Sequence, residues 1–212
     1  MWVMDPKLTN AALNLKRRAK KFSKARGPTL PALWLVTDEM RLPDPAAALA
    51  SLPRGAGLIL RHYDAPHRAA LAKRLSTICR RRGIAFLIAG DWRLAAAVDA
   101  TGLHLAEHAA RRGPPPGARL WLQRSKLLTV AAHGAAGLHR AKALRASAAM
   151  LAPVFATASH PDRGCLGAMR ATALIRRAGV PVVALGGITA TTINRLQNSA
   201  CAGVAGISFA LS

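Results

Sequence analysis

Two glycine-containing segments near the C-terminus have a composition suited to binding a phosphate group. Residues 181–188 form an apolar run that contains Gly186 and Gly187, and residues 203–208 read Gly-Val-Ala-Gly-Ile-Ser. Because glycine has no side chain, backbone N–H groups at such positions can approach an anion closely. The pattern therefore predicts phosphate recognition by backbone amides. The alternative is that these glycines only form turns at strand ends.

The elements that must position these two segments are short apolar runs that alternate with longer helical stretches. After Pro31, mostly continuous apolar runs of the kind found in parallel strands covered on both faces occur at residues 33–37, 57–60, 85–89, 102–105, 127–132, 149–155, 180–185 and 203–209. Helical stretches lie between several of them, at residues 66–82, 92–100, 135–147, 166–178 and 189–200. Residues 109–124 receive no assignment.

This order of elements predicts an α/β fold, a (β/α)8 TIM barrel, with a doubly wound open sheet as the alternative. In a barrel, the loops after the seventh and eighth strands commonly bind phosphate. Residues 5–26 predict an extra N-terminal helix that starts at Pro6 and has one apolar and one basic face. No final C-terminal helix is predicted, and we expect the N-terminal helix to occupy its place. The predicted division is a basic N-terminal helix over residues 1–29, packed on a barrel over residues 30–212.

The charge of the chain favours anionic partners. Its 212 residues include 31 Lys and Arg against 9 Asp and Glu, a formal net charge of +22. Nucleic acids, phosphorylated metabolites and acidic membrane surfaces are the partner classes that such a charge attracts. Aromatic residues make up only 4% of the chain, which is low for stacking on single-stranded bases. We therefore expect most of the charge to lie on solvated helix surfaces.

Composition also restricts the class and the compartment of the protein. A hydrophobic content of 51% excludes wholesale disorder, and no apolar stretch approaches the roughly 18 residues of a transmembrane helix. The first residues lack the pattern of a secretory signal. The three cysteines are widely spaced, which argues against a disulfide scaffold or a zinc ribbon and favours a reducing cytoplasm. The oligomeric state is left open, a homodimer included.

Several segments, taken in order, resemble the thiamine phosphate synthase and TenI family. The similarity spans about residues 32–210 and rests on residues 33–38 (Leu-Trp-Leu-Val-Thr-Asp), 102–105 (Gly-Leu-His-Leu), 130–133 (Val-Ala-Ala-His), 153–157 (Pro-Val-Phe-Ala-Thr), 186–188 and 203–208. The resemblance implies a (β/α)8 barrel that joins an aminopyrimidine methyl diphosphate to a thiazole phosphate and releases pyrophosphate. It also implies Mg²⁺ and cations around the leaving group, where negative charge accumulates.

The resemblance assigns roles to particular residues. It implies Arg61 at the leaving group, Asp91 as a metal ligand, and Thr157 at either anion. The backbone amides expected to bind the thiazole phosphate are those of Gly186, Gly187, Ile207 and Ser208.

The sequence departs from the family pattern at the pyrophosphate site. The family's second strand reads Gln-x-Arg-x-Lys, whereas residues 59–63 here are Ile-Leu-Arg-His-Tyr and keep only Arg61. Ala109 stands where the second metal carboxylate belongs, and His160 stands where the family has a lysine. Several charged contacts to the diphosphate are therefore missing, so Mg²⁺ binding is doubtful and a weakened or altered synthase is predicted.

Neighbouring residues are candidates to compensate for these losses. Glu107 is a possible alternative metal ligand, and Arg93, His160 and Arg163 are possible alternative cations. His133 is an auxiliary candidate whose alternative is a purely structural role. Pro153 stands where related thiazole tautomerases use a histidine, which argues against tautomerase chemistry.

Three function hypotheses follow. The first is a divergent enzyme of the thiamine phosphate synthase type that acts on a small phosphorylated metabolite. The second is a non-catalytic barrel that binds a phosphorylated ligand or has a regulatory role, which would explain phosphate loops beside a lost metal site. The third, motivated only by the charge, is a nucleic-acid-binding protein, which would bind less tightly as salt rises.

Overall fold

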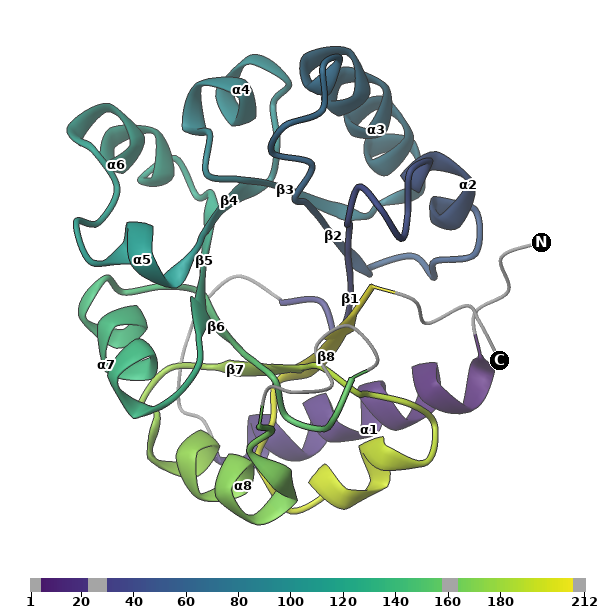
Figure 1. Ribbon diagram of the computed structural model, residues 1–212, viewed down its shortest axis with the longest axis vertical. Coiled ribbons are helices and arrows are strands. Elements are labelled where there is room, and N and C mark those ends of the chain that lie inside the picture. Colours follow the sequence, from purple (N-terminus) through teal and green to yellow (C-terminus); the bar gives the residue numbers. More distant parts are fainter. Residues whose placement is uncertain (1–4, 23–29, 158–163, 208–212) are drawn as a thin grey trace.

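A closed barrel of parallel strands forms the centre of the protein (Figure 1). The computed structural model describes residues 5–22, 30–157 and 164–207, with no description of the side chains of residues 20–22. The strands pair in sequence order, and β1 closes the barrel by pairing with β8. They are β1 (Leu33–Val36), β2 (Gly57–Leu60), β3 (Ala85–Ala89), β4 (Gly102–Leu105), β5 (Leu127–Ala132), β6 (Ala148–Leu151), β7 (Val182–Leu185) and β8 (Gly203–Gly206). The predicted TIM barrel is confirmed, and the alternative of an open sheet is wrong.

Helices surround the barrel on its outside (Figure 1). They are α1 (Pro6–Phe22), α2 (Pro45–Leu49), α3 (Arg68–Arg82), α4 (Trp92–Ala97), α5 (Glu107–Ala110), α6 (Pro116–Leu122), α7 (Ala135–Ala143), α8 (Gly167–Arg177) and the short 3-10 helix η1 (Thr192–Leu196). Residues 109–124, which the sequence left unassigned, contain the end of α5 and all of α6.

The segment after β7 differs from its prediction. The sequence predicts a helix over residues 189–200, but the structure has only η1. Two hydroxyl contacts shorten it: Thr189 Oγ1 accepts the amide of Thr192 at 3.1 Å, and Ser199 Oγ donates to the carbonyl of Leu196 at 2.6 Å. Such side-chain bonds compete with the helical hydrogen-bond pattern at both ends of a short segment.

Successive side chains along each strand face two different apolar environments. One set of side chains fills the barrel interior, and it includes Trp34, Ile59, Leu87, Met150 and Val183. The opposite set packs between the strands and the surrounding helices. Because both faces are buried, each strand is a continuous apolar run rather than an alternating one.

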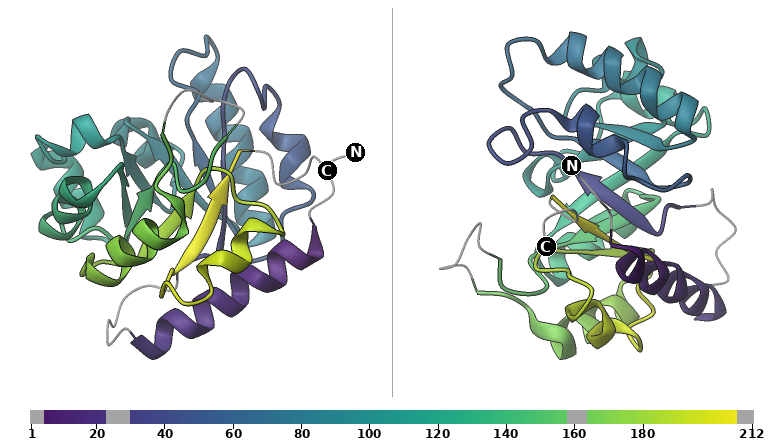
Figure 2. Two further views of the ribbon diagram at one scale, coloured as in Figure 1. Left: turned by 60° about the horizontal axis from the view of Figure 1, so that its bottom comes forward. Right: turned by 90° about the vertical axis from the view of Figure 1, so that its right-hand side faces the viewer.

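Helix α1 lies along the outside of β8, beside η1 (Figures 1 and 2). Leu8, Ala12 and Leu15 are buried in the same apolar cluster as Leu33 and Val204. The helix therefore covers the seam where β1 meets β8, which is the position predicted for it. Residues 23–26 of the predicted helix lie outside the described residues.

Two of the three cysteines are buried, and all three are free thiols. Burial raises the pKa of the Cys79 thiol to about 12. Within the described part of the chain, no helix is both long and apolar enough to cross a membrane.

Candidate functional site

Arg61 occupies the carboxyl end of β2, at the mouth of the barrel. It shares the strand face of Ile59, whose side chain belongs to the interior apolar cluster, so Arg61 is placed toward the barrel axis. Its amide donates to Thr37 Oγ1 at 2.9 Å, and the same hydroxyl is 2.8 Å from His62 Nδ1. Thr37 thus joins the end of β1 to the end of β2 and holds the backbone of Arg61 in place.

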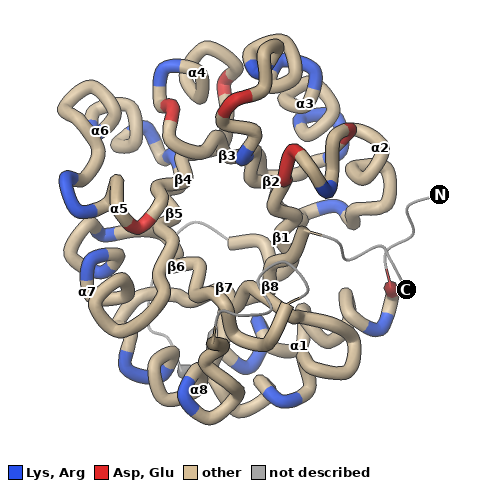
Figure 3. The backbone as a smooth tube through the Cα atoms, in the orientation of Figure 1, with Lys and Arg blue, Asp and Glu red and all other residues tan. Residues whose placement is uncertain are grey.

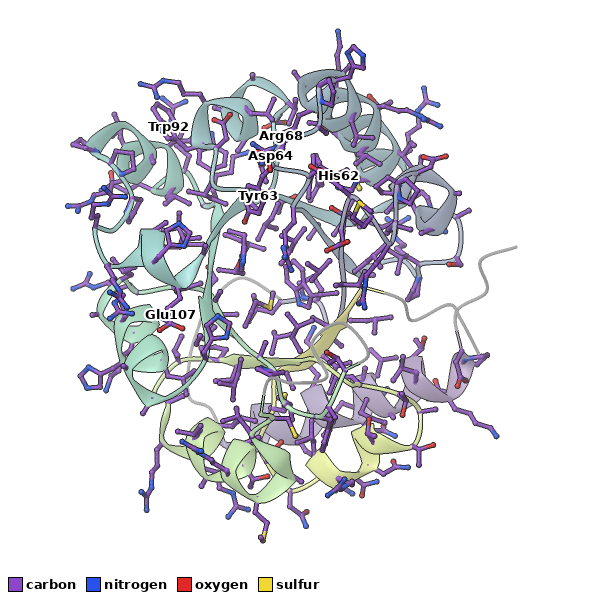
Figure 4. All side chains as sticks on the ribbon, in the orientation of Figure 1. His62, Tyr63, Asp64, Arg68, Trp92 and Glu107 are labelled. Atoms are coloured by element: carbon purple, nitrogen blue, oxygen red, sulfur yellow. The ribbon has the colours of Figure 1, made fainter. Side chains whose placement is uncertain are left out.

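A second arginine, Arg68, contacts Tyr63, which lies two residues after Arg61. Arg61 and Tyr63 line the same cavity, and the Arg68 guanidinium carbon lies 5.6 Å from the centre of the Tyr63 ring. Burial raises the pKa of the Tyr63 hydroxyl, although both arginines act in the opposite direction. The phenol is therefore neutral at physiological pH. We call Arg61, Tyr63 and Arg68 the two-arginine cluster, and Figure 4 shows Tyr63 and Arg68 near the ends of β2 and β3.

Arg68 is a candidate that the sequence analysis missed. It is the first residue of α3, and its guanidinium donates to the carbonyl of Ala89 at the end of β3. Its Nε is buried and has no hydrogen-bond partner among the described residues. The first turn of α3 has no acidic residue, so a cation stands where the helix dipole disfavours it. A basic residue at a helix start is the sequence signal that could have indicated this site.

A small cavity of about 170 Å³ opens beside the cluster, and it contains acidic as well as basic groups. Asp38, Glu39 and Asp64 line it together with Arg61 and Tyr63. Glu39 Oε1 accepts the amide of Asp64 at 3.0 Å, so one carboxylate also joins the loops after β1 and β2. Figure 3 shows several acidic positions near β2 and β3, whereas Lys and Arg positions are spread around the outer helices.

The expected metal ligands are engaged in structural contacts. Asp91 Oδ1 accepts the amide of Leu94 at 3.0 Å and caps the start of α4. Glu107 Oε2 accepts the amide of His133 at 2.8 Å, and Glu107 Oε1 lies 3.6 Å from Arg140. Figure 4 shows Glu107 outside the barrel, far from the two-arginine cluster.

These contacts do not fit a magnesium centre. Within the described ranges, no group of three His, Cys, Asp or Glu side chains is arranged so that it could hold a metal ion. Mg²⁺ requires near-octahedral oxygen ligands, whereas Asp91 caps α4 and Glu107 is engaged with His133 and Arg140. Mg²⁺ binding thus stays a prediction that the residue arrangement does not support.

Two histidines have structural partners. His133 Nδ1 lies 2.7 Å from the carbonyl of Ala152, and it connects the ends of β5 and β6. His104 lies inside the barrel, with Nδ1 2.9 Å from Thr129 Oγ1. Burial, with a smaller contribution from the charge of Arg61, lowers the pKa of His104 to about 3. His104 is therefore uncharged at neutral pH.

The glycine segment after β7 fits tightly against the loop after β6. Gly186 and Gly187 have φ angles of +96° and +64°, in the region that favours glycine. A Cβ at Gly187 would collide with the carbonyl oxygen of Ala156, and one at Gly186 would lie 3.0 Å from Pro153 Cα. These glycines therefore allow a close approach of two backbones, which is more than an ordinary strand-end turn requires.

Hydrogen bonds fix this pair of loops to η1. The amide of Phe155 donates to the carbonyl of Gly186 at 3.0 Å, and Thr192 Oγ1 donates to the carbonyl of Gly187 at 2.8 Å. The guanidinium carbon of Arg195 lies 5.2 Å from the centre of the Phe155 ring. Arg195 is thus a second cation, missed from the sequence, that stands next to the predicted phosphate loop.

The other predicted residues are placed as follows. Thr157 follows the loop that contacts Gly187 and is half-buried, as is Ile207 at the end of β8. Arg93 is exposed, and its guanidinium carbon stacks 5.1 Å above the Trp92 ring. Trp92 itself packs toward Gly117 in α6, so Arg93 is not brought to the two-arginine cluster. Ser208, His160 and Arg163 lie outside the described residues.

Comparisons with known proteins identify relatives of this chain. The sequence pattern of the thiamine monophosphate synthase family (TMP-TENI) matches residues 33–210. A thiamine-phosphate synthase of Synechococcus is 32% identical over 162 residues, which cover 75% of this chain and 45% of that protein. The bifunctional thiamine biosynthesis protein ThiED of Geobacter sulfurreducens is 30% identical over 182 residues, or 85% of this chain and 36% of that protein. This chain thus spans less than half of the length of both relatives.

A solved structure shares the fold. Thiamine phosphate pyrophosphorylase from Pyrococcus furiosus superposes with a TM-score of 0.68 at 21% identity, and the match covers 84% of this chain and 85% of that one.

Proposed function

Because the chain belongs to the thiamine monophosphate synthase family, we propose that the barrel mouth joins an aminopyrimidine methyl diphosphate to a thiazole phosphate and releases pyrophosphate. The observation that supports this proposal is that two elements whose residues suit an anion lie at one end of the barrel. The two-arginine cluster follows β2, and the loop that contains Gly186 and Gly187, which we call the glycine loop, follows β7. A reaction that needs one diphosphate and one phosphate requires two such elements.

The two-arginine cluster is proposed to hold the leaving group. When the bond to the methylene carbon breaks, the diphosphate leaves with the electron pair and gains negative charge. Guanidinium groups bind phosphate oxygens in a fork, and each charged hydrogen bond contributes about 1.5–3 kcal/mol. Arg68 would thereby replace the lysine for which Tyr63 stands, from a neighbouring element rather than from the same strand.

The glycine loop is proposed to hold the thiazole phosphate. The amides of Gly186, Gly187, Ile207 and Ser208 would donate to the phosphate, with Thr157 beside them. Arg195 would add a positive charge near this loop, where it stacks on Phe155. These assignments orient the two substrates toward each other across the mouth.

We propose that the reaction is slow compared with that of a synthase with a complete site. Electrostatic stabilisation of developing charge is a large part of catalysis, and removing one such contact commonly costs about 2.7–4 kcal/mol in the transition state. Here Asp91 caps a helix and Glu107 binds His133 and Arg140. The two arginines therefore stabilise the leaving group without the second metal carboxylate.

A second candidate function is a barrel that binds the phosphate ester without catalysis. The same contacts of Glu107 favour it. They occupy one expected metal ligand, and they do not involve the loop that would bind the phosphate. The two candidates share the glycine loop and differ only at the leaving-group site.

The deciding experiment measures both binding and turnover with the purified full chain. Calorimetric titration with thiazole phosphate and with pyrophosphate is combined with a product assay for thiamine phosphate. Arg61→Ala is compared with Arg93→Ala, which removes an arginine that also follows the carboxyl end of a strand but lies outside the cluster. We expect turnover that Arg61→Ala abolishes and Arg93→Ala leaves unchanged. Binding of thiazole phosphate with no turnover would replace the synthase proposal by the binding one.

A further inference from the structure

A larger cleft lies at the opposite end of the barrel from the mouth. It has a volume of about 370 Å³ and is formed by the C-terminal half of α3 and by the segments that lead into β3, β4 and β5. The lining residues with polar side chains that matter here are Ser76, Arg80, Asp99, Arg124, Ser125 and Lys126. Because these segments precede the strands, this basal cleft faces away from the two-arginine cluster and the glycine loop.

The basal cleft carries an excess of positive charge. Lys126 Nζ donates to Asp99 Oδ1 at 2.8 Å and to the carbonyl of Ala100 at 3.0 Å. Arg80 Nη2 lies 3.8 Å from Asp99 Oδ2. One carboxylate is thus shared by two cations. Among the described residues, Arg124 has no ion pair, so its charge is uncompensated.

The Lys126 ammonium is held in position before any ligand binds. The Lys126 ammonium lies 5.4 Å from the centre of the Trp121 ring, in addition to its two hydrogen bonds. Ser125, next to it, has a φ of +60°, which is uncommon for a residue other than glycine. Asp99, across the cleft, has a φ of +50°. Both residues lie just after a helix, α4 and α6 respectively, where a left-handed residue ends the helix and fixes the loop that follows.

We propose that the basal cleft binds a small phosphate ester through Arg80, Arg124 and Lys126, as a second anion site separate from the mouth. Guanidinium forks match phosphate oxygens, and the volume is at the lower end of the range typical for small-molecule sites. Ser125 adds a hydroxyl beside the two cations of its own loop. The site would let a phosphorylated metabolite bind without competing for the mouth.

The test uses the full chain with Arg61→Ala, so that binding at the mouth is weakened. Inorganic phosphate and adenosine monophosphate are titrated by calorimetry at low salt. The test variant adds Arg80→Ala and Arg124→Ala, and the matched control instead adds Arg170→Ala and Arg177→Ala. The control pair removes the same charge from exposed positions on α8. Arg80 makes only an exposed, long ion pair, so its loss is expected to leave the fold intact, which thermal unfolding checks.

We expect the test variant to bind the probe at least about tenfold more weakly than the control, because two charged contacts are lost. Tighter binding of the nucleotide than of phosphate would show that the cleft also contacts the body of the ester, and equal binding would assign the contact to the phosphate alone. Equal affinity of the test and control variants, or no binding by the Arg61→Ala protein, would overturn the proposal.

Discussion

The close packing of the glycine loop can be tested by adding one methyl group at Gly187. The loss in the free energy of unfolding then has two parts, a backbone part and a steric part, which a control variant separates. Gly187→Ala places a side chain at a φ of +64° and against the carbonyl oxygen of Ala156. Gly55→Ala is the matched control, since Gly55 has a φ of +79° and no atom within 4 Å of an added Cβ. The control isolates the backbone cost, about 1–2 kcal/mol for a non-glycine residue in the left-handed region.

Gly187→Ala adds a steric cost to that backbone cost. The carbonyl of Ala156 belongs to a loop whose neighbour Phe155 is hydrogen-bonded to Gly186, so the loop cannot move without breaking that bond. Overpacking of this kind typically costs about 1–3 kcal/mol. We therefore expect Gly187→Ala to lower the free energy of unfolding by about 2–5 kcal/mol in all, and Gly55→Ala by about 1–2 kcal/mol.

The assay combines urea unfolding with calorimetric titration of thiazole phosphate. Displacing the loop moves the backbone amides, so we expect about tenfold weaker binding in Gly187→Ala and unchanged binding in Gly55→Ala. The reasoning would be refuted if both variants lost the same stability and bound the phosphate equally well. In that case the contact with Ala156 would be neither rigid nor part of the site.

Three further predictions test the electrostatics of the barrel. Because the folded-state pKa of His104 is about 3 and its usual value is 6.5, protonation favours the unfolded chain. Below pH about 6.5 the stability should fall by up to about 1.4 kcal/mol per pH unit, a loss that His104→Gln should reduce in acid unfolding. Glu107→Gln removes the ion pair with Arg140 but keeps an oxygen for the amide of His133, so we expect a stability loss of about 1 kcal/mol and unchanged turnover. A large loss of turnover would instead identify Glu107 as a metal ligand. Pyrophosphate affinity should change less than about threefold when Mg²⁺ is added, since Asp91 already caps α4; a strong dependence in titration would restore the metal site.

The positions of the charged residues say more about possible ligands than the net charge does. The net charge of +22 first favoured anionic partners of any class. Figure 3 shows many of the basic segments on the outer helices, whereas acidic segments gather at one side of the mouth. At the mouth, Arg61 lines one cavity with Asp38, Glu39 and Asp64, and Arg68 stacks on Tyr63. Local geometry, rather than total charge, is therefore what the proposed phosphate sites depend on.

The barrel could be predicted from the sequence because its determinants are local and repeated. Continuous apolar runs specify strands that are buried on both faces, and the helical stretches between them specify parallel connections. The apolar face of the N-terminal helix likewise predicted that it would be covered, and Leu8, Ala12 and Leu15 are buried against β1 and β8. The pair Gly186 and Gly187 also stood out in the sequence, and the positive φ angles explain its composition.

What the sequence could not decide depends on contacts between distant segments. From the sequence, Glu107 was a candidate metal ligand. In the fold it contacts the amide of His133 and the side chain of Arg140, and no local sequence pattern encodes these two contacts. Arg68 carried no motif, and it became a site candidate only because the ends of β2 and β3 bring it to Tyr63 and Ala89. Periodicity determines which elements form, because it is a property of neighbouring residues. Which side chains meet at the mouth is decided only when the barrel closes.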